Sequence, residues 1–435
     1  VADRLRSEAT QRLDRAEAFF WFLDRFSSMN FAVIAEGRGM IDTVALQNAL
    51  AAAQLRHPLL AAGIHADAGG CLHFAPQPAN GIPLERIEAE DWRTALAERI
   101  VVNFPLGSAP LVRACLLGKD DHWAVALILH HSIGDARSAF TVLGEILQAT
   151  AGLPVDRTTL PLAPALGDLY PPQFLGEARG RHLEQLKALR RAAVEKTGLP
   201  APQAGHTHSR DLQPRFLSLH FSPAEVDALA ATARAAQSTV NGLIGAAQLI
   251  ALREQFGDTD ERTLGITCAA DLRPHLAIPV GAETPGFYVT LVTSIQRVGD
   301  AAGLLPLAAR VTAAIRQQIA GGFGHLFYDF MPPVDQFPAN DQGIAGFSGL
   351  MAKGVQTSLL SNAGRLPALP DLPGLTVTAR SFALCPTTTQ PVFTAVATDE
   401  SGMTINLNYN ATQLMPESAV TIAAAMDRLL RSTTA

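Results

Sequence analysis

The stretch His130-His131-Ser132-Ile133-Gly134-Asp135-Ala136 decides how this chain is interpreted. It follows an apolar run from Trp123 to Leu129, and because both alternating sets of side chains are apolar, the run predicts a strand buried on both faces. After Asp135, apolar residues recur at helical spacing, namely Ala139, Phe140, Leu143, Ile146 and Leu147. The pattern therefore predicts a strand, a tight turn and a helix, with Asp135 as the helix N-cap.

The two adjacent histidines at the end of this strand are expected to play different parts. Successive side chains on an extended backbone point to opposite faces, so His130 and His131 are not expected to share a proton or a metal ion. With no third His or Cys at ligand spacing, no metal site is predicted. We interpret His131 as the reactive imidazole and His130 as a packed ring hydrogen-bonded to backbone. On the sequence alone, a structural core histidine is the alternative for His131.

Composition narrows the class of protein. The chain has 435 residues, is 48% hydrophobic and carries a formal net charge of -6 without a long basic run, which argues against nucleic acid as the main partner. Its four cysteines are far apart and predict free thiols in a reducing cytoplasm; they are Cys71, Cys115, Cys268 and Cys385. The first ten residues lack the apolar core of a signal peptide, and the most apolar helical stretch, 243–252, is too short for a bilayer. A soluble cytoplasmic protein is expected.

The order of patterns along the chain predicts two mixed α/β subdomains, 1–175 and 176–435. In the first, Leu46, Ala49, Leu50 and Ala53 mark one face of a helix that ends before Pro58. Prolines crowd 154–172, and a charged helix over 177–196 with Leu183, Leu186 and Leu189 on one side begins a crossover linker at about 176–213. Strands are expected at 216–221, 263–269, 392–398 and 403–409, and helices at 223–237, 239–255 and near the C-terminus.

His130 to Ala136 resembles the HHxxxDG signature of the superfamily that includes condensation domains, chloramphenicol acetyltransferase, alcohol O-acetyltransferases and phthiocerol dimycocerosyl transferase. Ala136 stands where the signature has Gly, and a methyl group is tolerable there if the residue has helical dihedrals. Further stretches fall in the order that such proteins show. They are RLDRAEAFFWFLD at 12–24, IDTVALQNALAAAQLRHPLL at 41–60, AADLRPHL at 269–276 and SLLSNAGRL at 358–366.

The resemblance implies a fold and a chemistry. Two chloramphenicol-acetyltransferase-like subdomains would form a V with an active-site tunnel between them, and His131 would act as general base in acyl transfer from a thioester. Asp135 would organise the turn and pair with Arg273, which lies at the family's motif position in Asp271-Leu272-Arg273-Pro274. The alternative for Arg273 is a solvated loop residue.

Other candidate contacts are less specific. Ser361 and Asn362 are candidates to stabilise the oxyanion of the tetrahedral intermediate, although an Asn-Ala-Gly stretch is also typical of a turn at a strand end. Gly134 is expected to allow a close approach of the backbone to the substrate or the preceding strand, or else to be an ordinary turn glycine. The cluster Arg179, Arg181, Lys187, Arg190 and Arg191 fits either coenzyme A phosphates or an acidic carrier protein, or a solvated helix face.

We therefore predict an acyltransferase that forms an ester from a hydroxyl acceptor and a thioester of coenzyme A or an acyl carrier protein, in secondary metabolism or lipid assembly. No permanently bound cofactor, no membrane span and a monomer are expected. A stand-alone condensation enzyme that forms an amide is the alternative enzyme, since it would use the same histidine. A member that binds a carrier protein without turnover is the alternative from another class.

Overall fold

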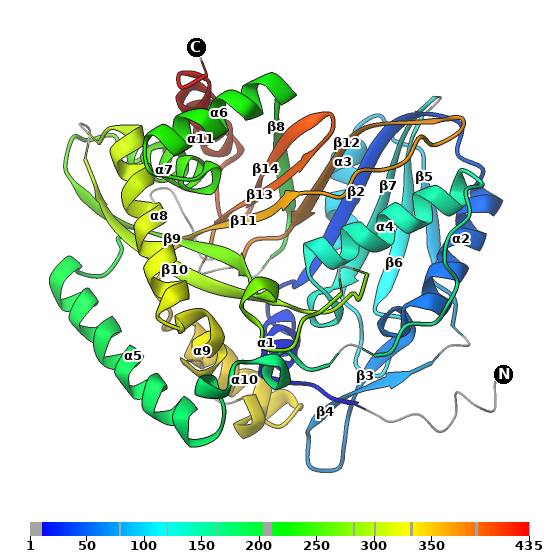
Figure 1. Cartoon of the computed structure of the whole chain (residues 1–435), viewed down its shortest axis with the longest axis horizontal. Helices are drawn as coiled ribbons and strands as arrows, with labels where there is room; N and C mark the ends of the chain where they lie inside the picture. Colours follow the sequence, from blue (N-terminus) through cyan, green and yellow to red (C-terminus); the bar gives the residue numbers. More distant parts are fainter. Residues whose placement is uncertain are drawn as a thin grey trace.

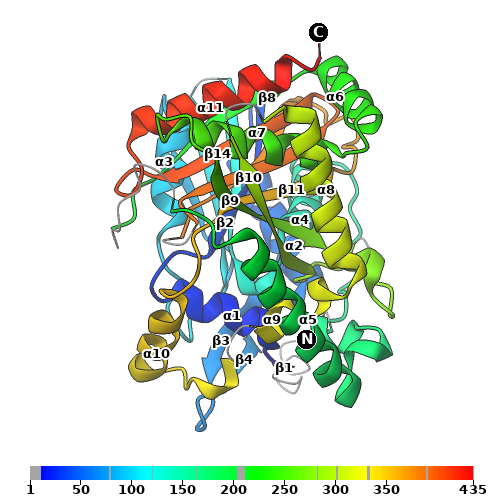
Figure 2. The same ribbon diagram turned by 90° about the vertical axis from the view of Figure 1, so that its left-hand side faces the viewer.

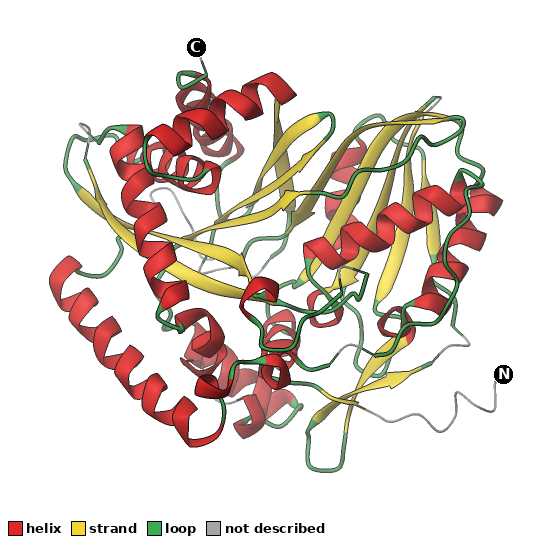
Figure 3. Ribbon diagram, in the orientation of Figure 1, coloured by secondary structure: helices red, strands yellow, loops and turns green. Residues whose placement is uncertain are grey.

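The computed structural model describes residues 11–77, 80–119, 121–162, 164–202, 211–281, 283–299, 302–330, 334–387 and 390–434. The chain folds into two α/β halves, each built on its own sheet, and a small third sheet lies beside the first half (Figure 1 and Figure 3). The fold class predicted from the sequence is confirmed. Part of the predicted crossover linker, residues 203–210, lies outside the described residues.

The sheet of the N-terminal half holds the strand that leads to the two histidines. Its order is β12-β2-β7-β6-β5, with β2 Asn30–Gly39, β5 Leu84–Ile87, β6 Val112–Lys119, β7 His122–His130 and β12 Leu375–Leu384. Strand β7 lies between β2 and β6, and all its residues after His122 are buried, as the apolar run predicts. Helices α2 (Thr43–Arg56) and α4 (Ala136–Thr150) cover one face, and α3 (Trp92–Ile100) packs on the other.

The sheet of the C-terminal half has the order β10-β9-β11-β13-β14-β8. Its strands are β8 Pro214–Phe221, β9 Arg262–Asp271, β10 Val289–Val298, β11 Ser358–Arg365, β13 Val392–Asp399 and β14 Gly402–Asn410. Helices α6 (Pro223–Ala235), α7 (Val240–Glu254), α8 (Leu304–Ala320) and α11 (Pro416–Arg431) cover its outer face, as Figure 2 shows. They enclose a core of their own, and the expected strands and helices of this half are present.

The remaining elements surround the region where the halves meet. They are β1 Gln11–Arg12, β3 Ala62–Ala66, β4 Leu72–Pro76, α1 Arg15–Asp24, α5 Gly176–Thr197, α9 Phe323–Phe330 and α10 Asp341–Met351. Helix α1 is buried almost all round and contacts α9 and α10 of the other half. It begins with a reciprocal capping box between Asp14 and Glu17, which satisfies backbone N–H groups at its buried start.

Two expectations about organisation need correction. Strand β12 falls in 176–435 but pairs with β2, in a register that places Ala383 opposite Ala32, so the predicted boundary at 175 divides the chain without separating the two sheets. The segment after β12 then returns to β13 in the second sheet. In α5, the predicted apolar stripe is incomplete, because Leu186 is buried whereas Leu189 is exposed. This helix packs against its neighbours along only part of its length.

Among the helices of the described ranges, none has the length and hydropathy needed to cross a bilayer.

Candidate active site

His131 lies directly after β7, at the start of the short 3₁₀ segment His131–Ile133. Its ring is packed against three phenylalanines, with centroid distances of 4.4 Å to Phe20, 4.8 Å to Phe31 and 5.4 Å to Phe287. Nδ1 lies 3.0 Å from the carbonyl oxygen of Gly134. Because a carbonyl can only accept, Nδ1 carries the proton and Nε2 is left as an acceptor.

The packing around His131 determines its charge. Burial lowers the pKa of His131 to about 4, since the surrounding aromatic rings cannot solvate an imidazolium. The ring is nevertheless partly accessible and lines a cavity, so it is not sealed off from ligands. The structure thus presents a neutral imidazole with a fixed tautomer at a cavity wall.

His130 points away from this site, as the strand geometry requires. Its Nδ1 accepts a hydrogen bond from the Ser132 backbone N–H at 3.2 Å, and its Nε2 lies 3.7 Å from the buried carboxylate of Asp24. Asp24 also accepts from the Met29 N–H and pairs with Arg25. The expected backbone contact of His130 is present, and the sequence did not indicate its carboxylate neighbour. In the described part of the chain, no group of three His, Cys, Asp or Glu side chains is arranged to hold a metal ion.

Asp135 is the N-cap of α4, as predicted, and it joins the two halves. Its side chain accepts from the Ser138 N–H at 2.9 Å within α4 and from the Tyr288 N–H at 3.1 Å in the other half. The predicted ion pair is present, with Arg273 Nη2 3.0 Å from Asp135 Oδ2. Asp135 is 1% exposed, so this carboxylate is a buried charge whose hydrogen-bonding capacity is used by backbone and guanidinium.

Arg273 is held on several sides. It donates to Asp271 at 3.0 Å and to the Ser138 hydroxyl at 2.8 Å, and its guanidinium lies 4.5 Å from the centre of the Tyr288 ring. The alternative of a solvated loop residue is therefore wrong. The Ser138 hydroxyl also accepts from the Gly286 N–H and donates to the Gly286 carbonyl, so one serine links α4, Arg273 and the 284–288 loop.

Gly134 and Ala136 lie on either side of Asp135, at the two positions of the turn where a glycine could be required. Gly134 has an extended backbone, and a Cβ there would lie 3.8 Å from its nearest neighbours, which is ordinary contact. The prediction that Gly134 permits a close approach to the preceding strand is therefore wrong. Ala136 begins α4 and is helical, so the methyl group that replaces the signature glycine is accommodated. The close approach occurs instead at Gly286, where a Cβ would lie 2.6 Å from the Tyr288 hydroxyl.

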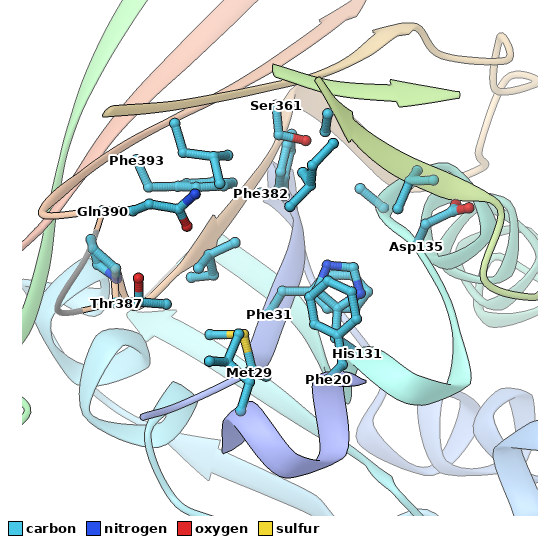
Figure 4. Close-up of a pocket in the computed structure, with 18 of the residues that line it drawn as sticks. Phe20, Met29, Phe31, His131, Asp135, Ser361, Phe382, Thr387, Gln390 and Phe393 are labelled. Atoms are coloured by element: carbon cyan, nitrogen blue, oxygen red, sulfur yellow. The ribbon is translucent and has the colours of Figure 1, made fainter. Parts of the chain in front are cut away.

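A cavity of ≈ 150 Å³ lies where the two halves meet, with His131 in its wall (Figure 4). Three of the predicted site residues, Asp135, Ser361 and Asn362, also line it, whereas His130, Gly134 and Arg273 do not. Most of the wall is apolar, and Figure 4 shows His131 and Phe20 across the space from Phe382, Phe393, Thr387 and Gln390. Ligand sites are typically about 300–1,000 Å³, so this cavity is smaller than the usual site for a whole ligand.

Ser361 and Asn362 lie on β11 and reach the cavity from the C-terminal half. The Asn362 side-chain oxygen accepts from the Gly364 N–H at 2.8 Å, and the pairing of β11 with β13 shifts register between Asn362 and Arg365. The Asn-Ala-Gly stretch is thus a local turn as well as part of the cavity wall. The Ser361 hydroxyl makes no side-chain hydrogen bond within the described ranges and is free to donate into the cavity (Figure 4).

A second, larger cavity of ≈ 500 Å³ lies beyond α1 and is lined by polar and apolar groups in similar measure. The Asp329 carboxylate in its wall pairs with both Arg15 and Arg179, and the wall holds equal numbers of arginines and aspartates, namely Arg12, Arg15 and Arg179 with Asp14, Asp168 and Asp329. The basic cluster on α5 behaves similarly. Four of its five members pair with acidic side chains or contact Phe330, namely Arg179 with Asp329, Arg181 with Glu177, Lys187 with Glu184 and Arg190 over Phe330. The solvated helix face is therefore the better interpretation of that cluster.

Several residues of the site could not be identified from the sequence. Phe20 lies in the stretch 12–24, but its spacing in the sequence did not predict that its ring contacts His131. Ser138 and Gly286 look like ordinary helix and loop residues, and Thr387 and Gln390 lie in the return from β12 to β13. Each contributes through a tertiary contact, which single-sequence periodicity does not encode.

Comparisons with known proteins agree with this architecture. Residues 210–413 match the family model described as the C-terminus of phthiocerol/phthiodiolone dimycocerosyl transferase. A phthiocerol/phthiodiolone dimycocerosyl transferase of Mycobacterium ulcerans (strain Agy99) is 24% identical over 294 residues, which cover 67% of this chain and 69% of the relative.

Solved structures share the fold over almost the whole chain. The trichothecene 15-O-acetyltransferase of Fusarium sporotrichioides matches with a TM-score of 0.74 at 13% identity, covering 98% of this chain and 95% of that one. The first condensation domain of the calcium-dependent antibiotic synthetase, solved with a substrate analogue, matches with a TM-score of 0.68 at 15% identity, covering 98% and 97%. The chain therefore has the chloramphenicol acetyltransferase-like fold that these acyltransferases and condensation domains share, and its residues 210–413 are similar to the C-terminal part of the dimycocerosyl transferases.

Proposed function

We propose that this protein transfers an acyl group from a thioester to a hydroxyl acceptor, with His131 as the general base. The proposal rests on the tautomer, the pKa and the position of the His131 imidazole. Its Nδ1 proton is donated to the Gly134 carbonyl, its pKa is lowered to about 4 by burial, and its edge lines the cavity between the two halves. Nε2 is therefore an unprotonated acceptor at neutral pH.

The proposed reaction has two steps. In the first, the acceptor oxygen attacks the thioester carbonyl while its proton passes to His131 Nε2, which gives a tetrahedral oxyanion and an imidazolium. In the second, the carbon–sulfur bond breaks, and the proton on Nε2 passes to the departing thiolate. The thioester is already an activated acyl donor, so the proposal requires no bound cofactor or metal and no covalent enzyme intermediate.

The protein groups supply separate parts of the rate. General-base assistance contributes about 10² to 10⁴, and holding donor and acceptor together contributes through proximity. The developing oxyanion needs a donor, and the Ser361 hydroxyl is the candidate because it lines the cavity and has no side-chain hydrogen bond to any described residue. Asp135 and Arg273 would act indirectly, by fixing the turn that carries His131.

A hydroxyl acceptor is favoured over an amine for two reasons. A hydroxyl group must lose its proton as it attacks, whereas a neutral amine is nucleophilic before it does, so a placed base matters more for ester formation. The names of two similar proteins also refer to acyl transfer, one of them to transfer onto oxygen. The donor is proposed to be a thioester of coenzyme A or of an acyl carrier protein. We also propose that the protein acts as a monomer in the cytoplasm.

The test is a turnover assay with matched acceptors. The protein is incubated with acyl thioesters of several chain lengths and with an alcohol and an amine of the same carbon skeleton, and thiol release and product mass are measured. Ester product with thiol release supports the proposal. Amide product alone would instead favour a stand-alone condensation enzyme. Absence of thiol release with every donor would favour a member that binds a carrier protein without turnover.

A further inference from the structure

Arg137 is the one lysine or arginine in the wall of the ≈ 150 Å³ cavity as the described residues form it. It is the second residue of α4, two positions after Asp135. Its side chain is 45% exposed although it lines the cavity, so it lies where the cavity meets solvent. A cation at the opening of an otherwise apolar cavity calls for an explanation, because nothing in the proposed acyl transfer uses it.

The contacts of Arg137 orient it without neutralising it fully. Nη1 donates to the Ala363 carbonyl oxygen at 3.1 Å, and Nε lies 3.6 Å from Asp271 Oδ2, which is beyond hydrogen-bond distance. An exposed pair of this kind contributes little to stability. The other oxygen of Asp271 is engaged by Arg273. Within the described ranges, Nη2 of Arg137 has no partner, so it is available to a ligand.

The turn in β11 holds Arg137 at this opening. Gly364 has a φ of 74°, and a Cβ at that position would lie 3.4 Å from Arg137 Nη1. Glycine therefore supplies the left-handed turn, and its Cα lies where a Cβ would be in van der Waals contact with the guanidinium. Gly364, the last residue of Ser361-Asn362-Ala363-Gly364, thus has a role that is separate from the proposed chemistry. The guanidinium bridges α4 of one half and β11 of the other.

We propose that Arg137 binds the phosphate of the phosphopantetheine arm that carries the acyl thioester, an inference that rests on the proposed function. Guanidinium groups recognise phosphate through charge-assisted hydrogen bonds, and Arg137 offers both charge and unused donors. The thioester end then enters the apolar cavity toward His131 while the phosphate stays at the solvent edge. Coenzyme A and carrier proteins share this arm, so the proposal concerns the arm and not one of its two sources.

The alternative to a binding role is a structural one. Arg137, Asp271, Arg273 and Asp135 form a series of alternating charges that reaches the turn carrying His131. If Arg137 only supports this series, its removal lowers the affinity for all ligands alike. If it binds phosphate, its removal lowers the affinity only for ligands that carry phosphate.

The experiment measures equilibrium binding by calorimetry, so that it does not depend on turnover. Pantetheine, 4′-phosphopantetheine and coenzyme A are titrated into the wild-type protein and into Arg137→Ala, Arg137→Lys and Arg428→Ala. The last is a matched control, because Arg428 is an exposed arginine paired with Glu254 between α11 and α7, away from the cavity. Folding of each variant is checked by its melting temperature.

The expected result is a change in selectivity. Wild-type protein should bind phosphopantetheine more tightly than pantetheine, and Arg137→Ala should reduce that ratio about tenfold, the effect of one charge-assisted contact. Arg137→Lys should keep part of the preference and Arg428→Ala all of it. A loss confined to coenzyme A would place the contact at its additional phosphates and would overturn the assignment to the shared arm.

An unchanged ratio in Arg137→Ala, or no preference for phosphate in the wild type, would also overturn the inference. Neither result would touch the proposed function, since thiol release from an acyl-pantetheine substrate tests acyl transfer without any phosphate. Conversely, a protein that binds phosphopantetheine through Arg137 but releases no thiol would retain this inference and lose the proposed activity.

Discussion

Removing either partner of the Asp135–Arg273 pair should destabilise the protein substantially. The pair joins α4 to the segment after β9, with 3.0 Å between Asp135 Oδ2 and Arg273 Nη2. Arg273→Ala leaves a carboxylate that is 1% exposed with only backbone donors. Breaking one side of a buried pair costs about 3 to 5 kcal/mol of unfolding free energy. Asp135→Ala also removes an N-cap, which by itself contributes about 1 kcal/mol.

The assay is thermal and urea unfolding of the two single variants and the double variant. The unfolding entropy of a chain this long makes 1 kcal/mol equivalent to roughly 1 °C, so each single variant should melt about 3 to 5 °C lower. The double variant should be less destabilised than the sum of the singles, with a coupling of about 1 to 3 kcal/mol. Arg428→Ala, which breaks an exposed pair, should change the unfolding free energy by less than about 1 kcal/mol.

Additivity of the two substitutions would refute the reasoning, because it would mean that the two side chains do not stabilise one another. A melting temperature of Arg273→Ala equal to that of the wild type would do the same. A loss of activity without a loss of stability would instead mean that Asp135 and Arg273 take part directly in the reaction and do not merely support the turn.

Three further predictions follow from the site. Because the neutral form of His131 is the base and its pKa is lowered to about 4, kcat should stay constant from pH 7 down to about pH 5 and fall only below that; a decline centred near pH 6.5 would contradict this. If the Ser361 hydroxyl donates to the oxyanion, Ser361→Ala should lower kcat by about 10² with little change in melting temperature, and an unchanged kcat would exclude it. Gly286→Ala should lower the unfolding free energy by about 1 to 3 kcal/mol, because its Cβ would lie 2.6 Å from the Tyr288 hydroxyl; a wild-type urea midpoint would show that the ring yields.

Local sequence determined much of this fold in advance. Strand β7, the N-cap at Asp135 and helix α4 follow from apolar spacing and capping chemistry, which act over a few residues. The ion pair between Asp135 and Arg273 was predicted by the resemblance and is present, although 138 positions separate the two residues.

What could not be predicted depends on contacts between distant segments. The residue pattern of strand β12 does not show which of the two sheets the strand joins. Only its pairing with β2 assigns it to the first sheet. The low pKa of His131 depends on Phe20, Phe31 and Phe287, which three different segments supply. The predicted close approach of Gly134 to the preceding strand was wrong because Gly134 has an extended, uncrowded backbone, and the crowded glycine, Gly286, lies in a loop without a motif.

The most direct test of the central claim is thiol release by His131→Ala with an acyl thioester and a hydroxyl acceptor. The variant should fold with a melting temperature close to that of the wild type and lose about 10² to 10⁴ in kcat, the contribution of a general base. Thiol release at the wild-type rate by the folded variant would contradict the claim that the imidazole of His131 removes the acceptor proton.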